Sequence, residues 1–144
     1  MLKLNDTSEQ SILNMLVEHK SISPQQLKQI ETLSNEGGKT KLETSFELNI
    51  TSPDKILTVL ADSYSLPKVE LKKIVITDKI KQLAALRYLR ENIIVPFEFT
   101  SEVIKVAIPD SSKLGLIKNI KNITQLEPDL YASSLTEIDN FYKR

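Results

Sequence analysis

The sequence predicts an α+β fold: a tandem helix-turn-helix N-terminal half, followed by a small half of order α-β-β-α-β-α with a three-stranded, mainly antiparallel sheet. Three observations lead to this prediction. Two Ser-Pro helix-start signals lie 29 residues apart, two β-rich runs are joined by a short polar connection, and the chain of 144 residues is 40% hydrophobic. A chain of this length removes about 70% of its unfolded surface from water, so it can form a core without a metal or a disulfide. We expect two units, residues 1–66 and 67–144.

Helical spacing of apolar residues marks the first half. An apolar series over residues 12–16 follows polar and acidic residues and predicts a first helix that ends near Lys20. Ser23-Pro24 then predicts the N-cap and the first position of a second helix, because proline at that position loses no hydrogen bond and already has a helical φ. Gly37-Gly38 should end this helix.

The same pattern then recurs along the chain. A short amphipathic segment over residues 39–48 precedes Ser52-Pro53, which repeats the helix-start signal. Several positions correspond at the same offset: Leu13 with Leu42, Val17 with Phe46, Leu27 with Ile56, and Ile30 with Val59. Two copies are too few for a solenoid, which needs about three or more units, so the pair should pack on itself or on the half that follows.

The second half alternates helices and strands. We expect residues 68–76 to be extended and Asp78 to cap a helix whose apolar residues recur at spacing three. Residues 93–99 and 103–108 predict a β-hairpin, and Pro96 places its first strand at a sheet edge or at a bulge.

The end of the chain continues this alternation. Residues 109–111 should start another helix, residues 126–132 should form the third strand, and Ser134 should cap a final helix. Ile138 and Phe141 are its expected buried residues.

Composition excludes several kinds of chemistry. The chain has no cysteine, which excludes disulfides, thiolate zinc sites and cysteine nucleophiles, and His19 alone cannot build a multi-histidine metal site. His19 should instead interact with the end of the first helix. No apolar run approaches the roughly 18 residues of a membrane span, and the start lacks a signal-peptide core. We therefore expect a cytoplasmic protein.

The charges balance overall but not along the chain. Residues 1–67 carry 6 basic and 9 acidic side chains, residues 68–90 carry 7 and 2, and residues 91–144 carry 6 and 8. We call residues 68–90 the basic belt. It is either a solvated helix face or a surface for an acidic partner or a phosphate. Its candidate partner-binding residues are Lys72, Lys73, Arg87 and Arg90.

One short string resembles half of a nucleotide-binding loop. Residues 37–40 read Gly-Gly-Lys-Thr, but Leu33 stands where such a loop needs its first glycine, and the segment follows a predicted helix rather than a strand. We therefore expect no nucleotide hydrolysis here. The sequence also offers no Ser-His-acid set and no spacing that places two carboxylates in one apolar pocket, so we expect no catalytic residues and no enzyme activity.

The order of elements and several strings together resemble a known family. The strings are Met15-Leu16-Val17-Glu18, residues 22–27, residues 52–62, residues 66–71, Ile94-Val95-Pro96-Phe97, residues 104–110 and the closing helix over residues 135–142. Over about residues 11–142 the chain resembles the N-terminal domain of type II secretion and type IV pilus assembly ATPases, the MshEN or GspE N-terminal domain.

The resemblance implies a non-catalytic docking or regulatory domain. Members of the family precede a hexameric ATPase at the inner membrane. In one branch the domain binds cyclic di-GMP through two tandem motif copies, and in another it docks onto the cytoplasmic part of an inner-membrane platform protein. The implied partners of this chain are that platform domain and, if the chain is a fragment, the ATPase region itself.

This sequence departs from the ligand-binding motif of the family. Ser11 and Thr40 replace the motif arginines, Leu13 and Leu42 the first glycines, Lys20 and Asn49 the second glycines, and Ser34 and Ser63 the glutamines. The two phosphates of cyclic di-GMP favour binding by arginine guanidinium groups, which donate two hydrogen bonds each, and close approach of the protein backbone at glycines. We therefore expect no cyclic di-GMP and no other cofactor or metal. A receptor using Lys20, Lys39 or Lys41 remains an alternative, as does a nucleic-acid adaptor using the basic belt.

Overall fold

The computed structural model describes residues 6–143, and for Asp6 and Thr7 the backbone alone. The ends of the two predicted units, residues 1–5 and 144, lie outside the described residues. The first half contains α1 (Asp6–Glu18), α2 (Pro24–Gly37), α3 (Lys41–Glu47) and α4 (Pro53–Ser63). The second half contains η1 (Leu71–Lys73), α5 (Asp78–Ala84), α6 (Arg87–Glu91), β1 (Val95–Phe99), β2 (Val103–Ile108), η2 (Ser111–Leu116), α7 (Ile117–Thr124), β3 (Glu127–Ala132) and α8 (Leu135–Lys143). The predicted α+β class is confirmed.

The helix starts and the helix stop follow from local residues, as predicted. The Ser23 side chain accepts a hydrogen bond from the backbone N–H of Gln26, and the Gln26 side chain accepts one from the backbone N–H of Ser23, which completes a capping box. Ser52 likewise caps α4 by accepting from the Lys55 N–H. Gly38 ends α2 with a left-handed φ of 68°, which glycine adopts without steric cost.

The predicted repeat extends to the backbone hydrogen bonds. α3 ends 29 residues after α1, and α4 begins 29 residues after α2. The turn after α1 is closed by the Ser21 N–H donating to the Leu16 carbonyl at 2.8 Å, and the turn after α3 by the Ile50 N–H donating to the Ser45 carbonyl at 3.0 Å. Each copy is therefore one helix-turn-helix unit with the same turn.

The sheet has the order β1-β2-β3 and corrects one expectation. β1 and β2 form the predicted antiparallel hairpin, and β1 is an edge strand with an irregular register between Pro96 and Glu98. β3, however, pairs with β2 in parallel, from Val103 opposite Glu127 to Ile108 opposite Ala132. The expectation of a mainly antiparallel sheet was wrong because η2 and α7 form a crossover, which returns the chain in the same direction.

The segment between the two halves also differs from expectation. Only Lys68 pairs as extended chain, in a bridge with Ala132, before η1 turns. Thr77 rather than Asp78 is the N-cap of the next helix, and the predicted helix divides into α5 and α6. The division has a packing reason: Ile80 of α5 packs on one face of the sheet, whereas Leu89 of α6 packs in the cluster on the other face.

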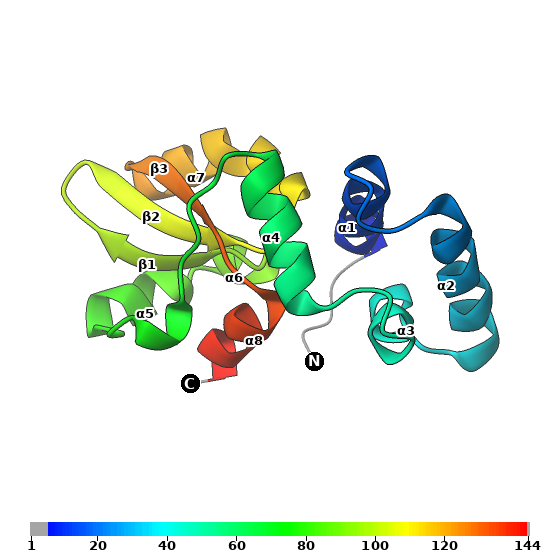
Figure 1. The fold of residues 1–144 in the computed structure, drawn as a ribbon. Helices are drawn as coiled ribbons and strands as arrows, with labels where there is room; N and C mark the ends of the chain where they lie inside the picture. The colour runs from blue at the N-terminus through cyan, green and yellow to red at the C-terminus, as the bar shows by residue number, and fades with distance from the viewer. Residues whose placement is uncertain (1–5, 144) are drawn as a thin grey trace.

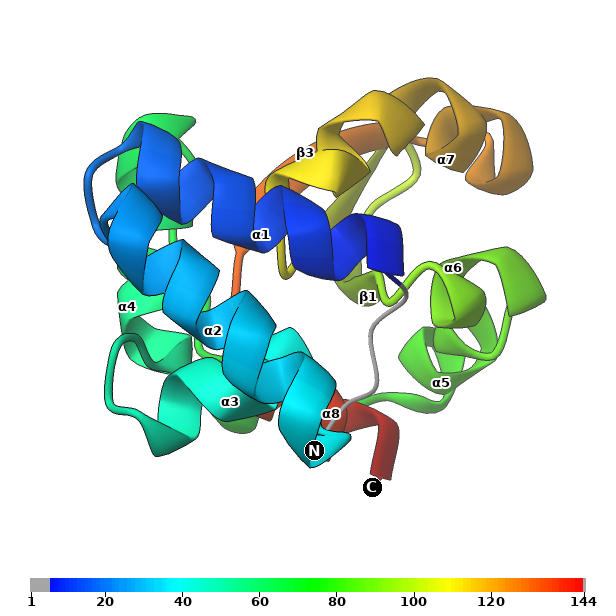
Figure 2. The same cartoon turned by 90° about the vertical axis from the view of Figure 1, so that its right-hand side faces the viewer.

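Helices cover both faces of the sheet. Figure 1 shows α5 and α8 on one side of it and α7 on the other, which matches the two buried clusters on these faces. A third cluster fills the space among the four N-terminal helices and also includes Ala132 and Leu135, from β3 and α8. Figure 2 shows α1 and α2 side by side, with α1 next to the yellow η2 segment. The core thus crosses the predicted boundary at residues 66 and 67.

Candidate functional site

The structure places the four belt residues at two ends of α5. Lys72 and Lys73 lie in η1, and Arg87 and Arg90 lie in α6. Lys73 lines a hollow beside the start of α5, whereas Arg90 lines a different hollow beside its end.

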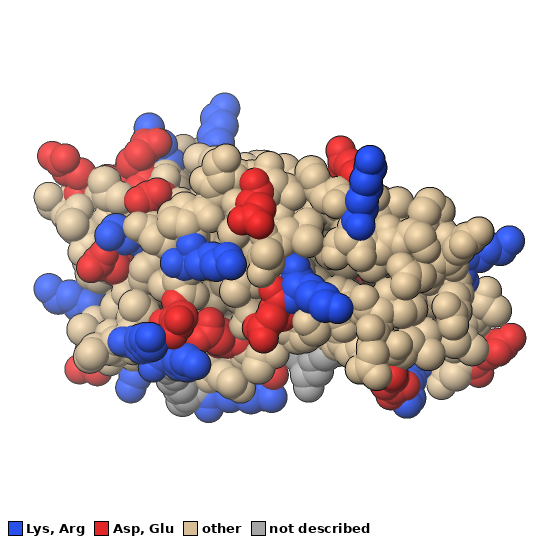
Figure 3. Space-filling model, viewed as in Figure 1, with Lys and Arg blue, Asp and Glu red and all other residues tan. Residues whose placement is uncertain are grey.

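Some of these cations already have carboxylate partners. The Lys73 Nζ lies 3.0 Å from Glu70 Oε2, and the Arg87 Nε lies 2.7 Å from Glu91 Oε1. Figure 3 shows basic and acidic side chains interspersed over the visible face of the sheet half. The basic belt is therefore not one continuous cationic surface on this face.

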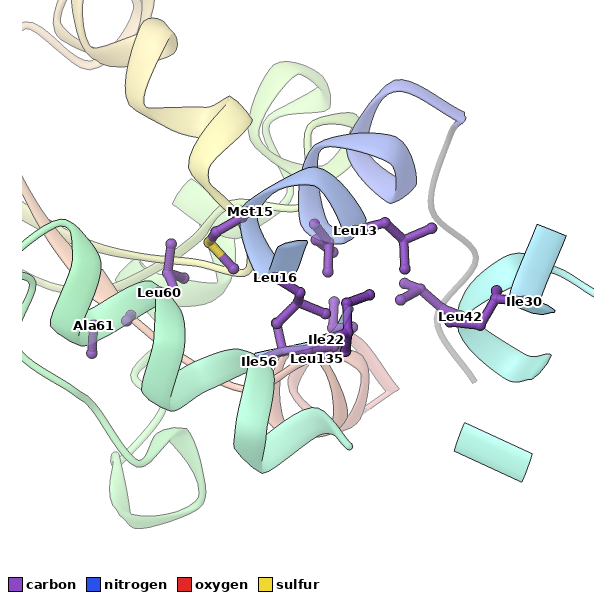
Figure 4. Close-up of a cluster of buried hydrophobic side chains, with 12 residues drawn as sticks. Leu13, Met15, Leu16, Ile22, Ile30, Leu42, Ile56, Leu60, Ala61 and Leu135 are labelled. Carbon is purple, nitrogen blue, oxygen red and sulfur yellow. The ribbon is translucent and has the colours of Figure 1, made fainter. Parts of the chain in front are cut away.

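The leucines at the first-glycine positions of the family motif are core residues. Leu13 is fully buried and Leu42 is 2% exposed. Both belong to the N-terminal buried cluster, where they lie near Ile30 (Figure 4). Their side chains fill the interior between the helices, so packing alone accounts for an apolar residue at each position.

The second-glycine positions keep a backbone conformation that glycine favours. Lys20 has a φ of 60° and Asn49 a φ of 56°, both left-handed. The Lys20 N–H donates to the Val17 carbonyl at 3.0 Å, and the Asn49 N–H donates to the Phe46 carbonyl at 3.1 Å. Residue identity alone missed this feature, but the position of both residues just beyond a repeated helix was a signal for it.

The hydroxyls at the arginine positions have local partners. The Ser11 Oγ lies 3.2 Å from the Ser111 Oγ of η2, and the Thr40 Oγ1 caps α3 by accepting from the Glu43 N–H at 3.1 Å. Ser11 therefore connects the helical half to the sheet half, and Thr40 caps the start of α3.

An open groove of about 790 Å³ runs along α1. Its lining includes Ser11, the carboxylates Glu9 and Glu18, and Lys41 opposite them. The Glu9 carboxylate accepts the Lys41 backbone N–H at 3.0 Å, and the Lys41 Nζ donates to the Gln10 side chain at 3.2 Å. With two carboxylates against one lysine, this lining favours anions poorly.

The lysines of the alternative receptor hypothesis are not gathered in this groove. Lys20 lines a separate hollow at the turn between α1 and α2, and Lys39 forms an exposed ion pair with Glu47. Lys41 alone of the three lines the groove along α1.

A buried polar cluster joins η2 to α1. Lys113 is 4% exposed and its Nζ donates to the Ser8 Oγ at 3.1 Å. Asp110 is fully buried, its Oδ1 accepts the Ser112 N–H at 2.8 Å, and its Oδ2 has no hydrogen-bond partner among residues 6–143. Burial raises the pKa of the Asp110 carboxyl and lowers the pKa of the Lys113 ammonium. Sequence reasoning missed this cluster, because nothing local distinguishes a buried lysine from an exposed one.

The other residues considered from the sequence have structural roles. His19 is exposed just beyond α1 and packs edge-on against Tyr64, with ring centroids 6.2 Å apart. The Gly-Lys-Thr string connects two helices, α2 and α3. Within the described part of the chain, no group of three or more His, Asp or Glu side chains is placed to hold a metal, and no helix has the length and apolar character that crossing a membrane requires.

Comparisons with known proteins give structural matches only. No family model and no curated protein matches the sequence. A structure of MshE with cdg matches with a TM-score of 0.65 and 19% identity, covering 92% of this chain and 96% of that chain. Two crystal forms of the N-terminal domain of XpsE match with TM-scores of 0.61 and 0.55 and identities of 19% and 21%. They cover 99% and 100% of this chain and 97% and 99% of those chains.

These matches extend over nearly whole chains on both sides. At such low identity the likeness establishes a shared fold. The fold that the resemblance implied, that of the MshE and XpsE N-terminal domains, is therefore confirmed.

Proposed function

We propose that this chain is a docking or regulatory domain of a type II secretion or type IV pilus assembly ATPase and acts through protein contact rather than catalysis. The carrying observation is the fold match, which spans 99% of this chain and 97% of the N-terminal domain of XpsE. The role is inferred by analogy of fold, and this analogy extends over nearly the whole of both domains rather than over a shared substructure.

The proposed partner is the cytoplasmic domain of an inner-membrane platform protein. On this proposal the chain works in the cytoplasm and is recruited to the inner membrane by that contact. The surface of the sheet half offers the exposed cations Lys72, Lys73, Arg87 and Arg90. Two of them, Lys73 and Arg90, line hollows that also contain apolar side chains. Such a mixture suits a protein interface with an apolar centre and a polar rim.

The test is direct binding. The purified chain is titrated against the cytoplasmic domain of the cognate platform protein, with the cytoplasmic domain of an unrelated membrane protein as control. We expect saturable 1:1 binding to the platform domain alone. Absence of binding to the platform domain and to every other component of the pilus or secretion machine would overturn the proposal.

A cyclic di-GMP receptor is the second candidate, because one matched structure is that of MshE with cdg and because Lys20 and Asn49 keep left-handed backbones. We expect no binding, since Leu13 and Leu42 fill the interior at the first-glycine positions. Titration calorimetry with the MshE N-terminal domain as positive control tests this, and micromolar or tighter affinity would contradict the expectation.

A further inference from the structure

A cleft between α5, α6 and α8 has an apolar lining and two exposed cations. Its volume is about 260 Å³, and its apolar residues include Ile76, Ala84 and Phe141. Lys81 of α5 and Arg90 of α6 also line it, and both are exposed. Small-molecule sites usually measure about 300–1,000 Å³, so this cleft is better matched to one large side chain of a protein partner.

The two cations of the cleft are available to a partner. Neither Lys81 nor Arg90 forms an ion pair with a carboxylate among the described residues, whereas Lys73 and Arg87 of the same belt do. Among the described side chains, none that lines the cleft is acidic. Its electrostatic potential should therefore favour carboxylates.

The remaining wall of the cleft is held in place by the core. The Tyr142 hydroxyl donates to the backbone carbonyl of Ile94, and burial raises the pKa of this phenol well above its usual value. Tyr142 thus offers its ring, not its hydroxyl, to an occupant. A rigid aromatic wall beside an apolar floor is typical of the pockets that receive anchor residues.

We infer that this cleft docks an acidic segment of the partner protein, which inserts one apolar side chain while its carboxylates pair with Lys81 and Arg90. The inference rests on the proposed function and selects one face for it. A nucleic-acid strand fits less well, because Glu70 and Glu91 pair with neighbouring cations and a phosphate backbone gains nothing from an apolar floor.

Three variants test the cleft against the same platform domain. Lys81→Glu/Arg90→Glu reverses its charges, and Ala85→Phe fills it from the exposed end of α5 without changing charge. Lys28→Glu/Lys118→Glu makes an equal charge change at exposed lysines of α2 and α7, outside the cleft. We expect at least about tenfold weaker binding for the first two variants and a change within about twofold for the third. Circular dichroism checks that each variant is folded, and binding of the wild type should weaken with salt.

The outcomes separate the two proposals. If the wild type binds and the cleft variants bind equally well, the cleft is not the docking site and the proposed function stands. If the wild type does not bind the platform domain or other machine components, the proposed function fails and the inference falls with it. Salt-dependent binding of a DNA duplex that is lost in Lys81→Glu/Arg90→Glu, without platform binding, would assign the cleft to nucleic acid and overturn the inference.

Discussion

Leu42→Ala should destabilise the protein strongly. Leu42 is 2% exposed and lies in the N-terminal cluster with Leu13 and Ile30 (Figure 4). The substitution removes three buried carbon atoms. The burial of each contributes about 0.8 kcal/mol to stability, or about 2.4 kcal/mol in total. The cavity left behind adds to this, which gives a loss of about 3–4 kcal/mol in the free energy of unfolding.

Thermal and urea unfolding measure this loss. For a chain of this size 1 kcal/mol shifts Tm by about 2–4 °C, so Tm should fall by about 6–16 °C. Leu48→Ala is the matched control, because Leu48 is 36% exposed at the end of the same helix. The free energy of unfolding of Leu48→Ala should fall by less than about 1 kcal/mol.

Equal losses for the two variants would refute this reasoning, because they would mean that Leu42 does not fill the interior between the helices. The shape of the transition carries further information. The same cluster contains Ala132 and Leu135, so the helical half and the sheet half should unfold in a single transition. Two separated transitions would instead support independent units at residues 1–66 and 67–144.

Three further predictions concern backbone conformation, charge and capping. Lys20→Gly should raise the free energy of unfolding, measured in urea, by up to about 1 kcal/mol. Asn49→Gly should raise it by less, because asparagine tolerates a left-handed φ better than lysine. A lower free energy of unfolding in both variants would contradict a positive φ at these positions. Asp110→Asn keeps the oxygen that caps η2 but removes the buried charge. Because burial raises the folded pKa of Asp110 above its unfolded value of about 3.9, the folded wild type holds more protons and loses stability as pH rises through that window. The Tm of Asp110→Asn relative to wild type should therefore increase from about pH 3.5 to pH 7, and a constant or shrinking difference would argue against the buried carboxylate. Ser23→Ala and Ser52→Ala should each cost about 1 kcal/mol in thermal unfolding, with the larger loss at Ser23, where a capping box is broken; no loss at either serine would show that the caps add no stability.

Sequence reasoning succeeded where structure depends on neighbouring residues. Ser23 and Ser52 cap helices because their hydroxyls reach N–H groups three residues ahead. Pro96 lies in an edge strand because it has no N–H to donate in a sheet. The hairpin follows from two apolar runs with a short polar connection.

The candidate site could be predicted only in part. Sequence reasoning identified Leu13 and Leu42 as departures from the first glycines of the family motif, and the structure shows that both side chains are buried. It did not find the left-handed backbones of Lys20 and Asn49, although both residues follow a repeated helix end, because lysine rarely adopts a positive φ.

Local patterns along the chain were sufficient to predict the 29-residue repeat, the helix starts at Ser23 and Ser52, the hairpin and the α+β class. The reason is that capping, φ preferences and apolar periodicity act over a few residues. Three features became evident only in the folded chain: the parallel pairing of β3, the burial of Lys113 against Ser8 and the position of Arg90 beside Lys81. These features join residues far apart in the chain. Their geometry depends on how the layers pack, which no local pattern specifies.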